Sequence, residues 1–123
     1  MEMSLKTDGT VAALRVSGPV RLDEVANLSE YLRVARENGA VRCIVDFSEC
    51  GDLPTPVMAV LFRESTRFQE AGGGLAVSGV TRQNPFLAEA VATCRLQHYR
   101  TVEEAWAAER GRDVAAGATL TPS

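Results

Sequence analysis

Few side chains in this sequence could take part in covalent or acid–base chemistry, and they are scattered: Cys43, Cys50, Cys94, His98 and Asp46. A nucleophilic cysteine needs a neighbouring base, and the single histidine lies far along the chain from Cys50. Three cysteines without a Cys-x-x-Cys pair also argue against a disulfide framework and against a zinc site. We therefore predict a protein that is not an enzyme and that uses no metal or cofactor.

Each of these residues has a simpler interpretation. Cys43 lies inside an apolar run and is expected to pack in the core, whereas Cys50 follows in a loop and could be exposed. A receiver-type role for Asp46 would need an acidic cluster and a lysine at matching strand ends, so we expect Asp46 to bond to nearby backbone. Because no other ligands accompany His98, we expect it to be packed or on the surface.

Thr55 has the most distinctive position among the hydroxyl groups. The run Val41–Phe47 is dense in β-branched residues and predicts a strand buried on both faces. Turn-forming residues follow at 48–52, and Thr55-Pro56 then opens a helical pattern. Threonine can cap a helix by accepting a hydrogen bond from a backbone N–H, and proline is favoured at the first helical position. A strand that runs through a loop into a helix is where α/β domains usually present their functional edge.

The remaining elements alternate around this segment. Strands are predicted at 3–7, 11–16, 41–47, 75–80 and 96–99, and helices at 22–38, at 55–71, from Asn84 and from Thr101. The Asp8-Gly9 turn makes the first strand pair an antiparallel hairpin, and the later alternation predicts a mostly parallel sheet with helices packed on it. The fold class is therefore α/β, in the order ββαβαβαβα. We expect 41–47 at the centre of the sheet and helices 22–38 and 55–71 on the same side.

Local patterns support these helices. Leu22, Val25, Leu28, Leu32 and Ala35 fall on one face of the first helix, and Glu64 is the one polar residue in the apolar series of the second. We interpret Gly72-Gly73-Gly74 as a helix terminator, because a phosphate cradle needs a strand before it and a helix after it. Thr101 and Glu104 have the spacing of a capping box, and we expect Trp106 to dock the last helix.

Length and composition limit the possible functions. A chain of 123 residues, 46% hydrophobic and 24% charged, is typical of a single soluble domain. We place this domain at 1–110 and expect a disordered tail at 111–123. With 13 basic and 16 acidic residues there is no basic stripe for nucleic acid. No run is long enough to span a membrane and no signal pattern opens the chain, so we expect a cytoplasmic protein that neither binds nucleic acid nor inserts into a membrane.

Four stretches together resemble the STAS domain, the fold of the bacterial anti-sigma factor antagonists. Val16-Ser17-Gly18-Pro19-Val20 is similar to the second strand and Gly-x-Leu turn of the family, and Cys43-Ile44-Val45-Asp46-Phe47-Ser48 to its hallmark central strand. Ala71-Gly72-Gly73-Gly74-Leu75 resembles its helix-to-strand turn, and Tyr99-Arg100-Thr101-Val102-Glu103-Glu104-Ala105 its final strand and helix. The four stretches occur in the family's order, from about Met3 to Ala108.

The resemblance implies a regulatory switch that binds a protein partner, a kinase-like anti-sigma factor. In the family this partner phosphorylates a Ser or Thr at the start of the second helix, which here corresponds to Thr55, and phosphorylation breaks the complex. The implied partner-binding residues are Arg21, Asp23, Asp52, Pro54, Pro56 and Met58. The family's Asp-Ser-Ser-Gly is here Pro54-Thr55-Pro56-Val57, and Arg21 replaces an acidic residue. We expect a monomer or weak dimer.

Two other interpretations remain open at this stage. The first is a STAS scaffold that is not phosphorylated, an accessory subunit in a stressosome-like or transporter assembly, in which Thr55 is only a helix cap. The second is a small enzyme or nucleotide binder of doubly wound topology. The second is disfavoured because the chain has no Gly-rich strand-to-helix turn, metal cluster or nucleophile–base pair.

Overall fold

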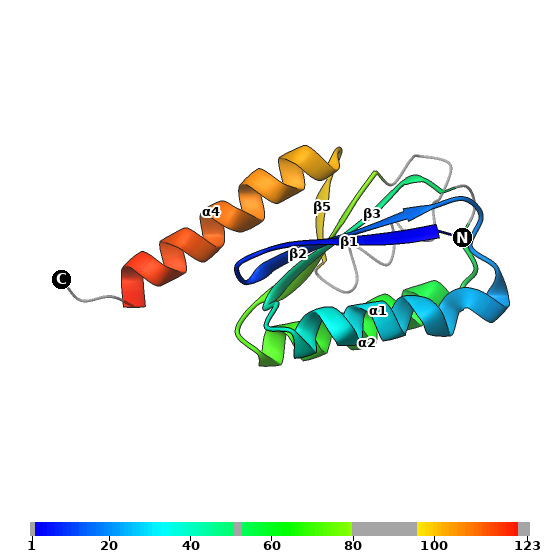
Figure 1. Ribbon diagram of the computed structural model, residues 1–123, viewed down its shortest axis with the longest axis horizontal. Helices are drawn as coiled ribbons and strands as arrows, with labels where there is room; N and C mark the ends of the chain where they lie inside the picture. Colours follow the sequence, from blue (N-terminus) through cyan, green and yellow to red (C-terminus); the bar gives the residue numbers. More distant parts are fainter. Residues whose placement is uncertain (1, 51–52, 80–95, 121–123) are drawn as a thin grey trace.

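Five strands form one mixed sheet at the centre of the molecule (Figure 1). The computed structural model describes residues 2–50, 53–79 and 96–120, with 112–120 described by their backbone alone. The strands lie in the order β1-β2-β3-β4-β5, with β1 antiparallel to β2 and the other pairs parallel. Their bounds are Glu2–Asp8 (β1), Val11–Ser17 (β2), Arg42–Glu49 (β3), Gly74–Ser78 (β4) and Gln97–Tyr99 (β5). The predicted fold class and the central position of β3 are confirmed.

Helices cover both faces of this sheet. The short 3₁₀ helix η1 (Leu22–Glu24) leads into α1 (Val25–Glu37), which lies beside α2 (Pro56–Glu70) on one face. Helix α4 (Val102–Leu120) lies on the opposite face (Figure 1). Parallel strands need crossover connections, and α1 and α2 supply them between β2, β3 and β4. The prediction that the first two long helices share one side is confirmed.

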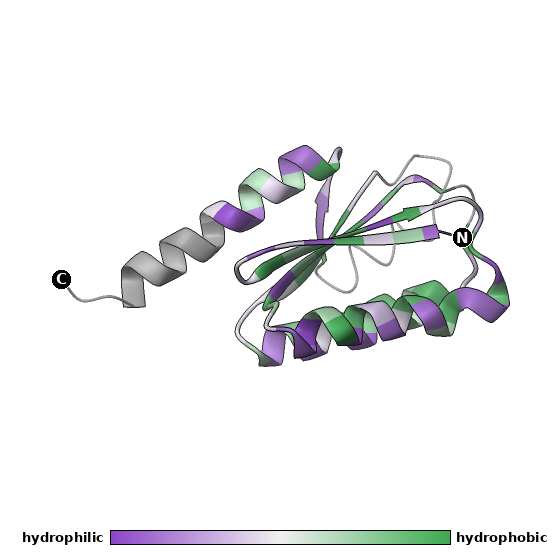
Figure 2. Ribbon diagram, in the orientation of Figure 1, coloured by the Kyte–Doolittle hydropathy of each residue, from purple (hydrophilic) through white to green (hydrophobic). Residues whose placement is uncertain are grey.

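The hydrophobic core has two layers, because successive side chains of a strand point to opposite faces. In the larger layer, Val45 and Phe47 of β3 pack with Leu28 of α1 and Phe68 of α2. In the smaller layer, Ile44 packs with Ala105 of α4, and Trp106 joins it from the same helix as predicted. Figure 2 shows hydrophobic and hydrophilic residues alternating along α1 and α2, as expected for helices with one buried side.

The turn from α2 to β4 confirms that the three glycines terminate a helix. Gly72 has a φ of +89°, which favours glycine. The Gly73 N–H donates to the carbonyl of Phe68 at 2.9 Å, closing the last turn of the helix. A Cβ on Gly73 would lie 1.5 Å from the Val41 carbonyl oxygen, so the turn after α2 and the residue before β3 approach too closely for any side chain here.

Three element predictions differ from the structure or lie outside it. Leu22 belongs to η1 and is 69% exposed, so its predicted place on the core face was wrong. Helix α4 continues to Leu120, beyond residue 111, where we predicted a disordered tail to begin; the domain boundary at residue 110 stays a prediction. The helix predicted from residue 84 lies outside the described residues. No helix in the described part of the chain is long and apolar enough to cross a membrane.

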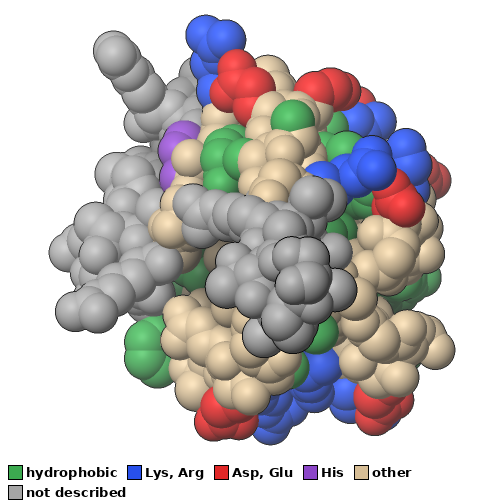
Figure 3. All heavy atoms as spheres, turned by 90° about the vertical axis from the view of Figure 1, so that its left-hand side faces the viewer, with side chains coloured by type: hydrophobic (Ala, Val, Ile, Leu, Met, Phe, Trp, Pro, Cys, Tyr) green, Lys and Arg blue, Asp and Glu red, His purple; other side chains and the backbone are tan. Residues whose placement is uncertain are grey.

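The surface mixes charges of both signs. On the face shown in Figure 3, acidic and basic side chains lie next to one another. On α1, for example, Arg33 forms ion pairs with Glu30 and Glu37 one turn away on either side. Leu22 is the most exposed of the large hydrophobic side chains described, followed by Phe62. The position of Leu22 matters for the site below.

Candidate functional site

The candidate site is the edge of the sheet where β2 and β3 end. These two strands are parallel neighbours, so the chain leaves both of them at the same edge. The two exits are joined directly, because the Gly18 N–H donates to the Glu49 carbonyl at 3.1 Å. The next element after β2 is η1, and the next element after β3 is α2. The segments that the sequence predicted to bind a partner are therefore brought together by the strand pairing.

Asp46 anchors this edge from inside the protein. Its carboxylate is buried and accepts hydrogen bonds from the Ser48 hydroxyl at 2.8 Å and the Ser48 N–H at 3.3 Å. The Ser78 hydroxyl of β4 donates to it at 2.9 Å, and Arg15 of β2 lies 3.5 Å away. Asp46 thus connects three adjacent strands, β2, β3 and β4, and fixes the position of Ser48. The predicted bond to nearby backbone is confirmed.

Thr55 lies at the start of α2 with its side chain exposed. Its φ of −51° and ψ of −40° are already helical, whereas a capping residue is usually extended. As a result the Thr55 hydroxyl makes no capping hydrogen bond, and the predicted side-chain cap was wrong. The backbone closes the first turn instead, because the carbonyls of Pro54 and Thr55 accept from Val57 and Met58 at 3.0 Å. Pro56 occupies the first helical position, as predicted.

The other predicted partner-binding residues belong to these same two helix starts. Arg21 and Asp23 are exposed and form an ion pair with each other at 3.4 Å. Pro56 is exposed, whereas Pro54 and Met58 are half-buried, and Met58 packs against the larger core layer. Asp52 lies outside the described residues. Sequence reasoning missed Leu22, which lies in η1 between Arg21 and Asp23 as an exposed apolar side chain.

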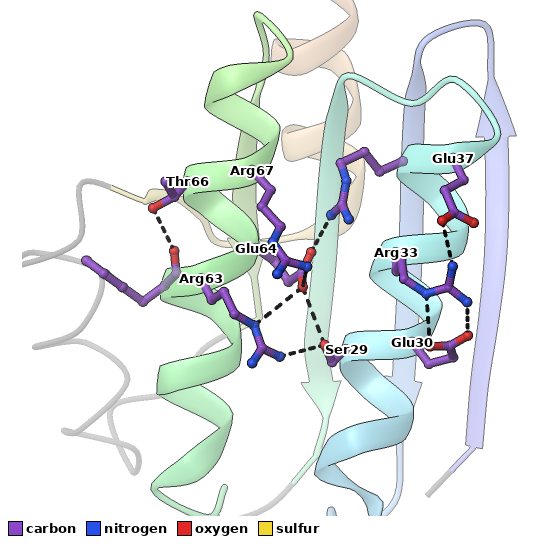
Figure 4. Close-up of polar contacts among 10 residues, drawn as sticks. Ser29, Glu30, Arg33, Glu37, Arg63, Glu64, Thr66 and Arg67 are labelled. Carbon is purple, nitrogen blue, oxygen red and sulfur yellow. Dashed lines mark hydrogen bonds and ion pairs between the residues drawn. The ribbon is translucent and has the colours of Figure 1, made fainter.

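Glu64 fixes the helix that carries Thr55. This glutamate of α2 is fully buried, and Arg36 of α1 donates to it at 2.5 Å (Figure 4). Arg67 and Arg63 lie 3.5 and 3.8 Å from the same carboxylate, and the Ser29 hydroxyl donates to it at 3.4 Å. The guanidinium of Arg36 also lies over the ring of Phe68. The sequence marked Glu64 as the polar exception on an apolar face, and its role is to lock α2 onto α1.

Known structures share this arrangement. SpoIIAA, an anti-sigma factor antagonist, in its unphosphorylated form aligns over 89% of this chain and 99% of its own, with a TM-score of 0.74 and 13% identity. A single-residue variant of RsbS from Moorella thermoacetica covers 92% and 98% with a TM-score of 0.74 and 13% identity. An anti-sigma factor antagonist from Mycobacterium paratuberculosis covers 89% and 93% with a TM-score of 0.69 and 18% identity.

The chain has a STAS fold. At these identities the likeness concerns the fold alone. No protein-family model and no curated protein matches the sequence. The resemblance noted in four short stretches of sequence is therefore confirmed at the level of the fold by the described backbone.

The thiols of this STAS fold are poorly suited to chemistry. Burial raises the pKa of Cys43 to about 12. Burial, followed by the charge of Asp46, raises the pKa of Cys50 to about 11, and the Cys50 thiol contacts the Val16 carbonyl at 3.3 Å. Both thiols are therefore protonated at neutral pH. His98 is exposed on β5, and Cys94 lies outside the described residues. Within the described ranges, no cluster of three or more His, Cys, Asp or Glu could hold a metal ion.

Proposed function

We propose that this chain is a non-enzymatic regulatory module of the anti-sigma factor antagonist type, which binds a protein partner through the edge formed by η1 and the start of α2. The observation that carries the proposal is that Thr55 is exposed and its hydroxyl makes no capping hydrogen bond, at the start of a helix that packs on the sheet of a STAS fold. The hydroxyl is not occupied in stabilising the helix, so it is accessible to a kinase.

Phosphorylation of Thr55 would act through the partner and not through the fold. SpoIIAA from Bacillus has also been solved in a phosphorylated form, which aligns with this chain at a TM-score of 0.70. A phosphate adds about −1.5 to −2 charges, and a helix N-terminus favours negative charge. The fold would accept this charge, whereas a docked partner would have to desolvate it.

The edge also offers an apolar anchor. Leu22 is 69% exposed between two charged residues, and protein interfaces commonly have an apolar centre surrounded by a polar rim. Arg21 and Asp23 form that rim, and charges of this kind influence partner choice more than affinity. We take the partner to be a kinase-like anti-sigma factor, and the place of action to be the cytoplasm.

The alternative is a STAS scaffold that is never phosphorylated. Pro54 and Pro56 flank Thr55 and restrict the backbone that a kinase active site would have to accommodate. Such a scaffold would use the same edge as a permanent docking surface within a larger assembly. The two functions therefore predict the same docking surface, and they differ in whether the Thr55 hydroxyl becomes phosphorylated.

A capture experiment with three variants tests the proposal. Wild type, Thr55→Ala and Thr55→Glu are used as baits in extract from the source cell. The captured proteins are then incubated with the bait and ATP, and the bait is weighed intact. A switch predicts that wild type gains one phosphate, that Thr55→Ala binds without gaining mass, and that Thr55→Glu fails to bind.

Two results separate the alternatives. If an active kinase is captured and the wild-type mass does not shift, Thr55 is not an acceptor and the scaffold function holds. If Thr55→Glu captures the same partner as wild type, charge at this position does not control docking. Circular dichroism of each variant shows whether the fold is retained.

A further inference from the structure

A groove lies on the opposite face of the sheet from α1 and α2. It has a volume of about 780 Å³ and runs between strands β1 and β2 on one side and α4 on the other. Its size falls within the roughly 300–1,000 Å³ typical of small-molecule sites. The lining comes from described residues of three elements, with Ala13 on β2 and Val102 and Trp106 on α4 among its apolar members.

The groove is basic although the protein is acidic. Lys6 of β1, Arg15 of β2 and Arg110 of α4 line it, and Glu103 is the one carboxylate among the lining residues; Asp46 and Asp8, which pair with the two arginines, lie outside the lining. The whole chain has a net charge of −3, whereas the lining residues alone carry three cations and one carboxylate. Positive charge on low-dielectric walls focuses the field on the space between them and attracts anions.

The cations that line the groove can still take a ligand. Arg15 and Arg110 each form one ion pair, with Asp46 at 3.5 Å and Asp8 at 3.1 Å, and both side chains remain about half exposed, at 50% and 54%. A guanidinium carries five N–H donors, so one ion pair leaves donors free for a second acceptor. The Lys6 ammonium lies over the Trp106 ring, 5.4 Å from its centre, and within the described part of the chain Lys6 has no carboxylate partner.

Trp106 supplies the complementary apolar surface. It is half-buried against the smaller core layer and also lines the groove, so its position is fixed while part of it is accessible. The Lys6 ammonium lies over one face of this ring, so a flat apolar group would pack against the part of the indole that the groove leaves accessible. The groove therefore combines one aromatic wall with three cations, which is the complement of a molecule with a flat body and an anionic end.

We propose that this groove is a binding site for a small organic anion with a flat, apolar body. The anionic group, a carboxylate, sulfonate or phosphate, binds to Lys6 with Arg15 and Arg110. The body lies against Trp106 and the Ala13 floor. This site does not use Thr55 or η1, so the proposal is independent of the proposed docking function and can be tested separately.

A pair of matched dyes tests the proposal. Anilinonaphthalene sulfonate has a flat body with an anionic group, and phenylnaphthylamine has nearly the same body without it. Trp106 is the only tryptophan of the chain, so energy transfer from it to the dye reports binding to the folded protein, and variants of the groove residues locate the site. The expected result is saturable binding of the sulfonate dye with energy transfer, and binding of the neutral dye about tenfold weaker, a difference of about 1.4 kcal/mol.

Charge variants of opposite sign make the test specific. Lys6→Glu and Arg110→Glu should each weaken binding of the sulfonate dye by about tenfold, and Glu103→Gln should strengthen it, because each changes the field in the groove in a known direction. Arg33→Glu on α1 makes the same charge change on the other side of the sheet and should leave the affinity unchanged. Near-ultraviolet circular dichroism and cooperative urea unfolding identify variants that have lost their packing. If a charge-reversal variant does not fold, the affinity of Glu103→Gln and the comparison of the two dyes on the wild-type protein still test the proposal.

Three outcomes would overturn the proposal. The first is equal affinity for the sulfonate and the neutral dye. The second is a loss of affinity in Arg33→Glu as large as in Lys6→Glu and Arg110→Glu, which would show a general charge effect. The third is an affinity for the sulfonate dye that Lys6→Glu and Arg110→Glu both leave unchanged, which would place the dye elsewhere.

Discussion

Glu64 of α2 and Arg36 of α1 are 28 residues apart in sequence and form a 2.5 Å hydrogen-bonded ion pair between the two helices. The Glu64 side chain is fully buried, whereas Arg36 keeps 20% of its side chain exposed. Burying a carboxylate is tolerated only when it is paired and hydrogen-bonded, and Glu64 has both kinds of partner. Since α1 follows η1 and α2 begins next to Thr55, this pair fixes the two halves of the proposed docking edge relative to each other.

Glu64→Gln should therefore destabilise the protein strongly. The substitution leaves Arg36, Arg63 and Arg67 without their shared carboxylate, and breaking a buried ion pair by removing one partner costs about 3–5 kcal/mol. Urea unfolding followed by circular dichroism measures the loss. Glu30→Gln is the matched control, because Glu30 is an exposed glutamate on α1 that also pairs with an arginine; it should cause no measurable change. If Glu64→Gln lowers the free energy of unfolding as little as the control does, the ion pairs of Glu64 with the three arginines do not contribute to stability.

Thr55→Ala and Thr101→Ala should differ in stability although both threonines precede helices. Thr101 accepts a hydrogen bond from the Glu104 N–H at 3.2 Å, so its loss should cost about 1 kcal/mol. Thr55 makes no such bond, and its replacement should change the free energy of unfolding by less than about 0.5 kcal/mol. Thermal and urea unfolding of the two variants in parallel provide the measurement. Equal losses would show that the Thr55 hydroxyl does cap α2 in solution.

Arg21→Asp should alter binding and leave the melting temperature nearly unchanged. Arg21 and its partner Asp23 are both more than 70% exposed, and exposed ion pairs contribute little to folding. At an interface, however, reversing a rim charge changes the association rate and the choice of partner. Differential scanning fluorimetry and binding kinetics at two salt concentrations address the two parts of this prediction. A large drop in melting temperature would assign Arg21 a structural role.

Cys50 should react slowly with iodoacetamide at neutral pH. Its pKa is raised to about 11, mainly by burial, so the thiolate is scarce in the folded protein. Because the folded pKa lies above the ordinary value of 9.0, folding disfavours the thiolate, and this group's contribution to stability is complete below pH 9 and declines as the pH rises above it. Peptide mapping after timed alkylation separates Cys50 from the other cysteines. Alkylation of Cys50 in the folded protein as fast as in urea would contradict the prediction.

Local patterns in the sequence were sufficient for most of the elements. The β-branched run after Val41 predicted the central strand, and the apolar spacing of Val25, Leu28 and Leu32 predicted the buried side of α1, because the periods of strands and helices are local properties. The same pattern misplaced Leu22. The chain forms a 3₁₀ turn there, with three residues per turn, so the 3.6-residue spacing does not apply to it.

The candidate site was only partly predictable. The identity of the edge followed from the order of strands and helices, since parallel strands end at a common edge. The state of the Thr55 hydroxyl did not follow, because a side-chain cap requires an extended backbone at that residue and the backbone of Thr55 is already helical. In the same way, Asp46 was expected to bond to local backbone, but its contacts with Arg15 and Ser78 depend on the register of β2 and β4 against β3.

By itself the sequence determined the α/β class, the order of the elements, the central strand and the glycine-rich stop of α2, because these depend on residue periodicity and turn chemistry within short windows. Only the tertiary structure decided that Arg36 neutralises Glu64, that Leu22 is exposed at the edge that carries Thr55, and that Lys6, Arg15, Trp106 and Arg110 line one groove. Each of these relationships joins residues far apart in the chain. It is created when the strands pair and the helices pack, and no local pattern records which distant side chains will then meet.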